Sequence, residues 1–422
     1  MKVLLLNIIL LIPFIVGSQT GLFIDGATFN VKDSTLIYVE GDVEIMLAGA
    51  IEDSGVIELT QHWTNNSGSV GLINNAPGIV RMIGANQRLQ GTDSTTFYNL
   101  ELRGFGIKEA FQNQTINNTL DLGTQELQVH DNIVHVTNTD PSSSLVWLPG
   151  GFVSGDVIGG YFARSTSFSA RYDFPVGNNN ITNTSSLLRA VSLTPSNADS
   201  NVYGVRLAYE DASLDASGTS FTGAFGPYNR SQREDFIVQV NPSFYHNIVR
   251  MQGTTPAYAS IYFYENDHID EDRRLDGLAN WEKNDFEWKL QTSTLDADLT
   301  SSPSGFLNPD HAMRWTMDNQ RDDPHALTVM EGIQVFVPQI FSPNQDGFND
   351  ILYVRGRKIS EVTFIIYNRW GEKVFETTDK NIGWNGKHRG KDAQASIYVY
   401  YVDAIVEDVG RVTQKGNITL VR

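Results

Sequence analysis

Short apolar runs recur along residues 19–165, separated by polar segments rich in Gly and Asn. Residues 35–39, 43–47, 56–59 and 78–83 are among them, and apolar and polar side chains alternate within each run. Alternate side chains of a strand point to opposite faces, so each run has one buried and one solvated face. A recurrence of roughly 10 to 20 residues is typical of stacked rungs. The pattern predicts a parallel β-solenoid over residues 19–165, with a large β-sandwich as the alternative.

The runs become longer after residue 165. The strands expected there span residues 187–193, 202–209, 236–240 and 257–264. Loops containing Asn, Asp, Ser and Gly separate them, which predicts an antiparallel β-sandwich for residues 166–334. Large aromatic side chains contribute most to core burial. We therefore expect Trp281, Trp288 and Trp315 to fill the core of this sandwich.

The first 18 residues have the pattern of a signal peptide. Lys2 gives a short positive region, residues 3–16 are almost wholly apolar, and small residues precede a cleavage point before Gln19. The apolar run is shorter than the roughly 20 residues that span a membrane. We therefore expect a mature protein that begins near Gln19 and does not itself span a membrane.

The composition excludes several kinds of chemistry. None of the 422 residues is Cys, so disulfides, thiolate metal sites and a Cys nucleophile are absent. Hydrophobic residues make up 41% of the chain, and its length suggests about three domains. Together with the strand pattern, this predicts an all-β protein with a signal peptide at 1–18 and domains at 19–165, 166–334 and 335–422.

Charge is distributed unevenly along the chain. The formal net charge is −18; residues 335–422 carry 12 Lys and Arg and 10 Asp and Glu, whereas residues 19–334 carry 18 and 39. The net charge of residues 19–334 is therefore −21. A surface of this sign argues against nucleic acid as a partner and is consistent with solubility outside the cell or with cation binding.

Residues 335–422 form a third region, with short strands rich in β-branched and aromatic residues. Asn, Asp and Gly separate these strands, which predicts a small antiparallel sandwich resembling an immunoglobulin domain. Trp370 and Trp384 each neighbour a Gly in a turn, and we expect both indoles to plug this small core. The loss of either indole from so small a domain would destabilise it severely.

This region closely resembles the type B C-terminal sorting domain, also called the gliding motility-associated C-terminal domain, of proteins exported by the type 9 secretion system of Bacteroidetes. The residues that carry the resemblance are Phe341, Ser342, Pro343, Asn344, Asp346, Gly347, Asn349, Asp350, Asn368, Arg369, Trp370, Gly371, Trp384, Gly386, Tyr398, Lys415 and Gly416. The resemblance implies export across the outer membrane, followed by attachment to the cell surface or release. It also implies two partners, the type 9 translocon and an outer-membrane barrel protein of the PorP/SprF-like family.

Two acidic loops are weak candidates for Ca²⁺, which takes six to eight oxygen ligands. Asp267, Asp270 and Asp272 lie in the first loop, and Asp346 and Asp350 lie in the second. Neither spacing matches an EF-hand. A solvated loop in the first case, and a network of Asx turns in the second, are the alternative interpretations. We expect no firm metal site and no other cofactor.

The sequence lacks the local motifs of common enzymes, including His-Glu-x-x-His, Gly-x-Ser-x-Gly and the phosphate-binding loops. We therefore expect a non-enzymatic protein of the cell surface that serves in binding, adhesion or surface structure. Two alternatives stay open. A secreted hydrolase acting on polysaccharide would need converging carboxylates in a groove, and an accessory subunit of the secretion or gliding machinery would share the same sequence features.

Overall fold

The computed structural model describes residues 2–4, 20–68, 71–74, 77–156, 159–178, 188–214, 228–234, 236–270, 273–296, 309–317, 324–330, 335–344, 350–356, 359–406 and 410–421. It is 58% strand and 2% helix, which confirms the predicted all-β class. None of the helices in these residues has the length and apolar character needed to cross a membrane. Most of the expected signal peptide, residue 1 and residues 5–18, lies outside the described residues.

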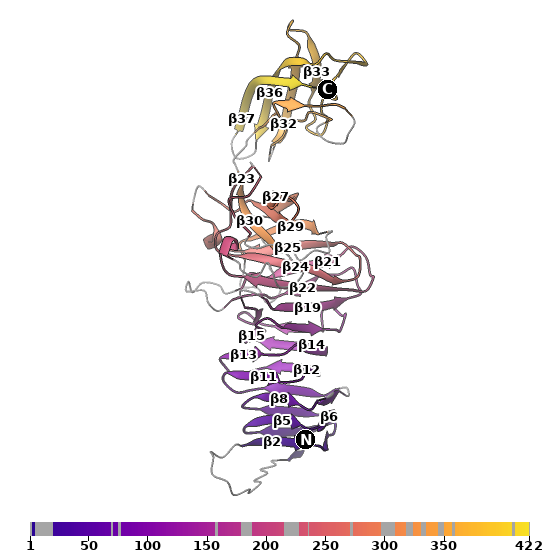
Figure 1. Ribbon diagram of the computed structural model, residues 1–422, viewed down its shortest axis with the longest axis vertical. Coiled ribbons are helices and arrows are strands. Elements are labelled where there is room, and N and C mark those ends of the chain that lie inside the picture. Colours follow the sequence, from indigo (N-terminus) through magenta and orange to yellow (C-terminus); the bar gives the residue numbers. More distant parts are fainter. Residues whose placement is uncertain are drawn as a thin grey trace. The chain divides into compact units, whose positions relative to one another are not determined.

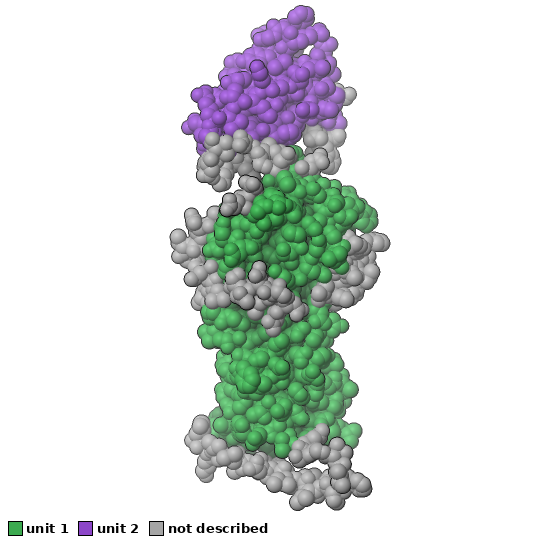
Figure 2. Space-filling model, turned by 90° about the vertical axis from the view of Figure 1, so that its left-hand side faces the viewer, with its two compact units in different colours: residues 1–330 green, residues 331–422 purple. Residues whose placement is uncertain are grey.

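The chain forms two compact units, shown in green and purple in Figure 2. Unit 1 comprises Met1–Met330 and unit 2 comprises Glu331–Arg422. Each unit has its own buried hydrophobic cluster. The start of unit 2 lies within a few residues of the expected start of the sorting domain at residue 335.

The first part of unit 1 is a stack of parallel strands, coloured indigo to magenta in Figure 1. One sheet contains β4 (Thr35–Val39), β7 (Val56–Leu59), β10 (Ile79–Met82), β12 (Thr95–Leu102), β14 (Gln114–Gly123) and β16 (Ile133–Val136), with β1 (Lys2–Leu4) beside β4 and β17 (Leu145–Trp147) beside β14. A second contains β2 (Gly21–Asp25), β5 (Asp42–Met46), β8 (Trp63–Asn66), β11 (Gln87–Gly91), β13 (Ile107–Ala110), β15 (Glu126–Gln128) and β18 (Phe152–Ser154). A short third sheet contains β3 (Thr28–Val31), β6 (Ala50–Asp53) and β9 (Leu72–Asn74).

Apolar side chains align from rung to rung, which confirms the predicted solenoid. Ile37, Ile57, Val80, Leu100 and Leu120 are register partners on successive strands, and all five are buried. Successive residues of each strand point alternately into and out of the stack, and this produces the alternation of apolar and polar residues in the sequence. Stacking buries each rung's apolar row against its neighbours, because a single rung cannot cover its own apolar face.

Polar side chains inside the solenoid satisfy backbone groups of its turns. Lys108 on β13 is fully buried, and its Nζ donates to the carbonyls of Gly84 and Ala85 at 2.8 and 2.6 Å. Gln87, its register partner on β11, donates from Nε2 to the Gln61 carbonyl at 2.6 Å. Burial lowers the pKa of the Lys108 ammonium to about 8. These contacts matter because a buried carbonyl without a donor costs free energy.

The solenoid continues into the second part of unit 1 through a shared sheet. Strand β19 (Tyr161–Thr166) pairs in parallel with β16 on one side and antiparallel with β22 (Asn201–Ala208) on the other. The expected domain boundary at residues 165 and 166 therefore falls inside a continuous sheet. At this junction the buried Arg164 donates to the Asp173 carbonyl at 2.8 Å and to the Ser144 Oγ at 2.6 Å.

The second part of unit 1 consists of two antiparallel layers. The long sheet continues through β22, β24 (Tyr245–Gln252), β30 (Pro324–Met330), β26 (Gly277–Glu282) and β27 (Glu287–Leu290), with β23 (Ile237–Val240) beside β30. The other layer, here called the five-stranded sheet, contains β20 (Tyr172–Phe174), β21 (Val191–Pro195), β25 (Ala257–Phe263), β29 (His311–Met317) and β28 (Ser293–Asp296). Two short 3₁₀ helices are η1 (Ala212–Leu214) and η3 (Glu265–Asp267).

Side chains from both layers share the cluster that also contains the solenoid core. Trp281, Trp288 and Trp315 are all buried, as predicted. Trp315 belongs to the shared cluster, whereas Trp281 and Trp288 pack edge to face with Tyr228 in a separate cluster. The core of this layered region is therefore divided into neighbouring parts.

Unit 2 is a small β-domain built on one five-stranded sheet, coloured orange to yellow in Figure 1. Its strand order is β31 (Ile340–Phe341), β37 (Gly410–Leu420), β36 (Ser396–Val406), β32 (Ile359–Tyr367) and β33 (Lys373–Thr377), and a separate short hairpin pairs β34 (Lys387–His388) with β35 (Lys391–Asp392). Alternate residues of β36 point into one apolar cluster, including Tyr398, Tyr400 and Val402.

Candidate functional sites

Trp384 is the central aromatic residue of unit 2. Its indole is buried, contacts the rings of Phe341 and Tyr398, and donates from Nε1 to the Lys387 carbonyl at 2.9 Å. Its backbone also bridges to Leu352. The prediction that Trp384 plugs this core is confirmed, because the side chain joins strand, loop and hairpin residues in one cluster.

Trp370 behaves differently, and the prediction that it plugs the same core was wrong. Its side chain is 80% exposed, in the turn between β32 and β33. The Asn368 Oδ1 accepts hydrogen bonds from the backbone N–H groups of Trp370 and Glu372 at 2.9 and 3.0 Å. Gly371 has φ +80°, which side chains rarely adopt. The Asx turn fixes the backbone so that the indole projects outward.

The other motif residues of unit 2 have mainly structural surroundings. Gly416 on β37 leaves room for a ring, since a Cβ there would lie 2.7 Å from the Tyr400 Cε1. Gly386 has φ +71° and lies against Pro343. Ser342, Asn344, Asp350 and Lys415 lie in the described part of the domain, whereas Asp346, Gly347 and Asn349 lie outside it.

Comparison with known families identifies this unit. Residues 335–420 match the family model described as the CHU_C type IX secretion signal domain. Unit 2 is a type IX secretion signal domain. The protein is therefore a secreted cargo of the type 9 secretion machinery, exported across the outer membrane to the cell surface or the extracellular space. A search of curated proteins found no match to the chain.

The type IX signal accounts for unit 2, so a ligand site for unit 1 has to be sought in its own surface. The five-stranded sheet carries a cavity of about 410 Å³. We call this cavity the sheet groove. Its lining comprises Arg171, Ser192, Thr194, Tyr258, Ala259, Ser260, Tyr262, Thr292, Thr294, Arg314, Trp315 and Thr316.

Strand register builds the floor of the sheet groove. Ser192, Ser260, Arg314 and Thr294 are partners across four neighbouring strands and form one polar row. In the next row, Tyr258 lies between Thr194 and Thr316, and its side chain is 61% exposed. The hydroxyls and the open ring therefore face the same cavity, although they come from segments far apart in the sequence.

Two arginines lie in the sheet groove. The Arg314 Nη2 is 3.1 Å from the Asp296 Oδ2, and the Arg171 Nε donates to the Asp173 Oδ1 at 2.7 Å. The Arg171 guanidinium also lies 5.5 Å from the centre of the Tyr262 ring. Asp173 and Asp296 thus balance the two guanidinium groups that line the cavity. Sequence reasoning missed this site, because only the sheet order brings its residues together.

The first acidic loop has partners that already engage its carboxylates. The Asp267 Oδ1 lies 2.5 Å from the nearly buried Arg189 Nη2, and the Asp267 Oδ2 accepts the backbone N–H of Tyr264 at 2.8 Å. Asp270 is paired with Arg273. Asp272 lies outside the described residues. The two described carboxylates therefore have guanidinium partners, and the calcium hypothesis for this loop stays a prediction.

A different group in the same region has the residue types of a metal site. Ligand atoms of Glu265, His268 and His311 lie within 4.8 Å of one another. The Glu265 Oε2 is 2.7 Å from the His311 Nε2, and its carboxylate also takes two hydrogen bonds from Arg274, at 2.6 and 2.9 Å. These hydrogen bonds, led by Arg274, lower the pKa of Glu265 to about 2.

The tautomer of His268 does not fit a metal at this group. Its Nδ1 accepts the backbone N–H of Leu275 at 2.8 Å, so the proton of the neutral ring lies on Nε2. Burial lowers the pKa of His268 to about 4, which keeps the ring neutral. A ligating histidine would need the opposite arrangement, with the far nitrogen donating. The group is better described as a hydrogen-bonded charge network.

Proposed function

We propose that this secreted cargo is a carbohydrate-binding protein of the cell surface, with the sheet groove of unit 1 as its binding site. The observation that supports the proposal most strongly is the exposed Tyr258 ring beside a row of hydroxyls and Arg314. An aromatic ring offers a flat apolar platform with an electron-rich face for the C–H side of a sugar. The hydroxyls and the guanidinium offer hydrogen bonds to its polar edge.

The arginines favour an acidic sugar. A guanidinium presents N–H groups in a planar fork that matches a carboxylate, and Arg314 uses one of them toward Asp296 at 3.1 Å. Residues 19–334 carry a net charge of −21, so a basic element in this region is unusual. A carboxylate of the ligand, such as that of a uronic acid, would replace Asp296 as the partner of Arg314.

The described groove favours binding over hydrolysis. Glycoside hydrolysis uses two carboxyl groups on either side of one bond. None of the described residues that line the groove is a carboxylate, and the neighbouring Asp173 and Asp296 each pair with an arginine of the lining. A binding role is therefore better supported than the hydrolase that the sequence leaves open.

We further propose that unit 2 holds the protein at the surface through an outer-membrane partner of the PorP/SprF-like family. The type IX signal domain supports handling by the secretion machinery. An exposed domain with edge strands can also dock on a partner by strand addition. Attachment would place the sheet groove outside the cell, where polysaccharide is available.

The test compares binding of the purified full chain to polygalacturonate, an acidic polymer, and to a neutral polymer such as xylan. We expect Tyr258→Ala and Arg314→Ala each to weaken polygalacturonate binding by about tenfold, the effect of losing one good contact. Affinity electrophoresis measures the change. Arg314→Lys keeps the charge but loses the fork, so it should restore only part of the affinity.

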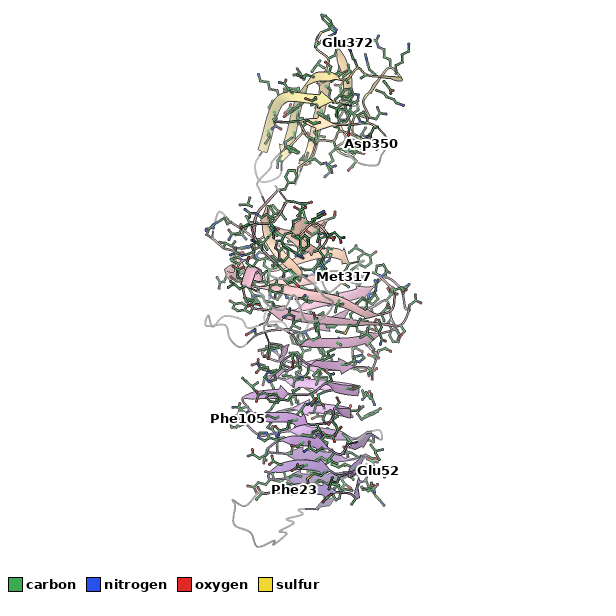
Figure 3. All side chains as sticks on the ribbon, viewed as in Figure 1. Phe23, Glu52, Phe105, Met317, Asp350 and Glu372 are labelled. Carbon is green, nitrogen blue, oxygen red and sulfur yellow. The ribbon has the colours of Figure 1, made fainter. Side chains whose placement is uncertain are left out.

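Phe105→Ala is the matched control for this test. Phe105 is 70% exposed between β12 and β13 of the solenoid, where Figure 3 labels it, and it is not among the residues that line the sheet groove. Its loss should leave binding unchanged. Equal binding by the wild type and the Tyr258→Ala variant would contradict the assigned site, and release of reducing ends from either polymer would favour the hydrolase instead.

A further inference from the structure

The β32–β33 turn of unit 2 holds an exposed indole in a fixed orientation. Besides the two hydrogen bonds that the Asn368 Oδ1 accepts, the Gly371 N–H donates to the Asn368 carbonyl at 2.9 Å. The turn therefore closes on itself through one residue, and the preceding strand β32 packs into the domain core. A side chain on such a turn loses little conformational freedom when it binds, which makes it suited to recognition.

The core of unit 2 does not use the indole of Trp370. The side chain is 80% exposed, and its described ring contact is with the neighbouring Arg369, whose guanidinium lies 5.0 Å from the ring centre. Trp and Arg are the residue types most enriched where a few side chains dominate the binding energy of a protein interface. A tryptophan that contributes little to folding and is held this far outward is available for a partner.

The sequence segment that contains the turn is basic, in contrast to the rest of the chain. Residues 368–391 contain six Lys or Arg and three Asp or Glu, a net charge of +3, whereas the whole chain has −18. Arg389 on the neighbouring short hairpin is 80% exposed at its side chain and reaches Glu372 at 3.0 Å. Figure 3 labels Glu372 at one end of the domain.

We propose that the turn Asn368–Glu372, with Arg369 and Arg389 beside it, is the element by which unit 2 docks on an acidic protein surface that has a cleft for the indole. This inference rests on the proposed attachment to an outer-membrane partner and specifies the contact that would make it. Opposite charges steer the approach of two proteins and fix their orientation. The indole then fills the cleft and slows dissociation.

A protein partner fits the turn better than a lipid surface. Stable membrane anchoring takes either a large apolar face or two separate lipid-binding signals. The turn offers one indole and a net charge of +3 over residues 368–391. One buried Trp is enough to dominate a protein interface, whereas it is too little apolar area to hold a protein of this size on lipid.

The test measures saturable binding of the purified full chain to outer-membrane vesicles from the producing cells, by co-sedimentation. Three probes are compared: intact vesicles, vesicles treated with protease, and liposomes made from the extracted lipids alone. We expect binding to the intact vesicles only. We expect Trp370→Ala to weaken it at least about tenfold, and the double change Arg369→Ala and Arg389→Ala to weaken it and to reduce its dependence on salt.

Ile397→Ala is the matched control, because Ile397 is 58% exposed on β36 of the same domain. It should bind the vesicles like the wild type. Wild-type affinity of the Trp370→Ala variant would overturn the inference while leaving attachment intact. Equal binding to the lipid-only liposomes would replace the protein partner by a lipid surface, and so would overturn it too.

Two further outcomes separate this inference from the attachment it rests on. Lack of any vesicle binding by the wild type would overturn the attachment through unit 2, and the docking turn with it. Because residues 19–334 are strongly acidic, the basic turn could also pair with a second copy of the chain. Light scattering of the wild type at the same concentrations tests this, and self-association that Trp370→Ala abolishes would assign the turn to that contact instead.

Discussion

Units 1 and 2 are both built of strands, but the buried contacts that stabilise them are arranged differently. In unit 1, each buried row of the solenoid continues from rung to rung, and buried polar groups such as Lys108 and Gln87 serve individual turns. In unit 2, one indole connects the sheet, a loop and a hairpin. Damage to a single rung should therefore stay local, whereas damage to the small core should affect the whole domain.

The surfaces of the two units differ in a corresponding way. Unit 1 presents a recessed site, in which several modest contacts from four strands converge on one cavity. Unit 2 presents one projecting side chain on a rigid turn. A recessed polar site suits a chain-like ligand with many hydroxyls, while a projecting indole suits a single cleft on a protein.

The largest effect is expected at Trp384. Trp384→Ala removes the buried indole and leaves the Lys387 carbonyl without its donor, so unit 2 should lose about 3–5 kcal/mol, enough to unfold a domain of this size. Calorimetry of the full chain should show the transition of unit 2 disappear while that of unit 1 is unchanged. A simultaneous shift of both transitions would show that the units are not energetically separate.

The next effect is expected at the junction within unit 1. Arg164→Met keeps much of the buried volume but leaves the Asp173 carbonyl and Ser144 Oγ without their donor. Each such group costs about 1–3 kcal/mol when buried. Unit 1 should melt at a lower temperature as one cooperative transition. Separation into two transitions would show that the solenoid and the layered region unfold independently despite their shared sheet.

Lys108 gives a pH dependence that belongs to unit 1 alone. Burial lowers its pKa from 10.5 to about 8, so between these values the unfolded chain binds a proton that the folded chain lacks. The free energy of unfolding of unit 1 should therefore rise as the pH increases from 8 toward 10.5. Lys108→Met should remove this rise and lower stability at pH 7, because three turn carbonyls lose their donor.

Denaturant titrations of unit 1 from pH 7.5 to 9.5 measure this dependence. The upper limit stays below pH 10, above which Tyr203 ionises in the unfolded chain while burial, which raises its pKa to about 12, keeps it protonated in the folded chain, so that stability falls. A flat profile for the wild type over this range would show that the ammonium of Lys108 keeps its proton when buried.

The smallest effect is expected at Trp370. Trp370→Ala removes an exposed side chain from a turn that Asn368 and Gly371 hold together, so the stability of unit 2 should change by less than about 0.5 kcal/mol. Together with Trp384→Ala, this variant separates folding from recognition in the same domain. A loss of several kcal/mol would mean that the indole packs against the domain in solution.

Much of the fold was predictable from the sequence, because alternation within short runs is a local property. The solenoid and the all-β class follow from it, and the burial of Trp281, Trp288 and Trp315 follows from the size of their side chains. The sequence could not distinguish the buried Trp384 from the exposed Trp370, since both lie next to Gly in a turn. Their burial depends on whether the turn folds over the core or away from it.

The sheet groove was beyond sequence reasoning for a related reason. Thr194, Tyr258 and Thr316 occupy outward positions on three strands, and each alone resembles any solvated position of a sheet. They meet because the sheet order places β21, β25 and β29 side by side. Order and register depend on long-range pairing, which the alternation of a single strand does not specify.

The length of the parallel stack of unit 1 is set by its number of rungs. Strands β4, β7, β10, β12, β14, β16 and β19 follow one another in the sheet, and a spacing of about 4.8 Å between neighbours makes this stack about 29 Å long. Inserting or deleting a whole rung would lengthen or shorten the stack by one such step while β19 and the layers after it keep their pairing. The number of rungs thus varies the length of the stack in fixed increments without redesigning either end.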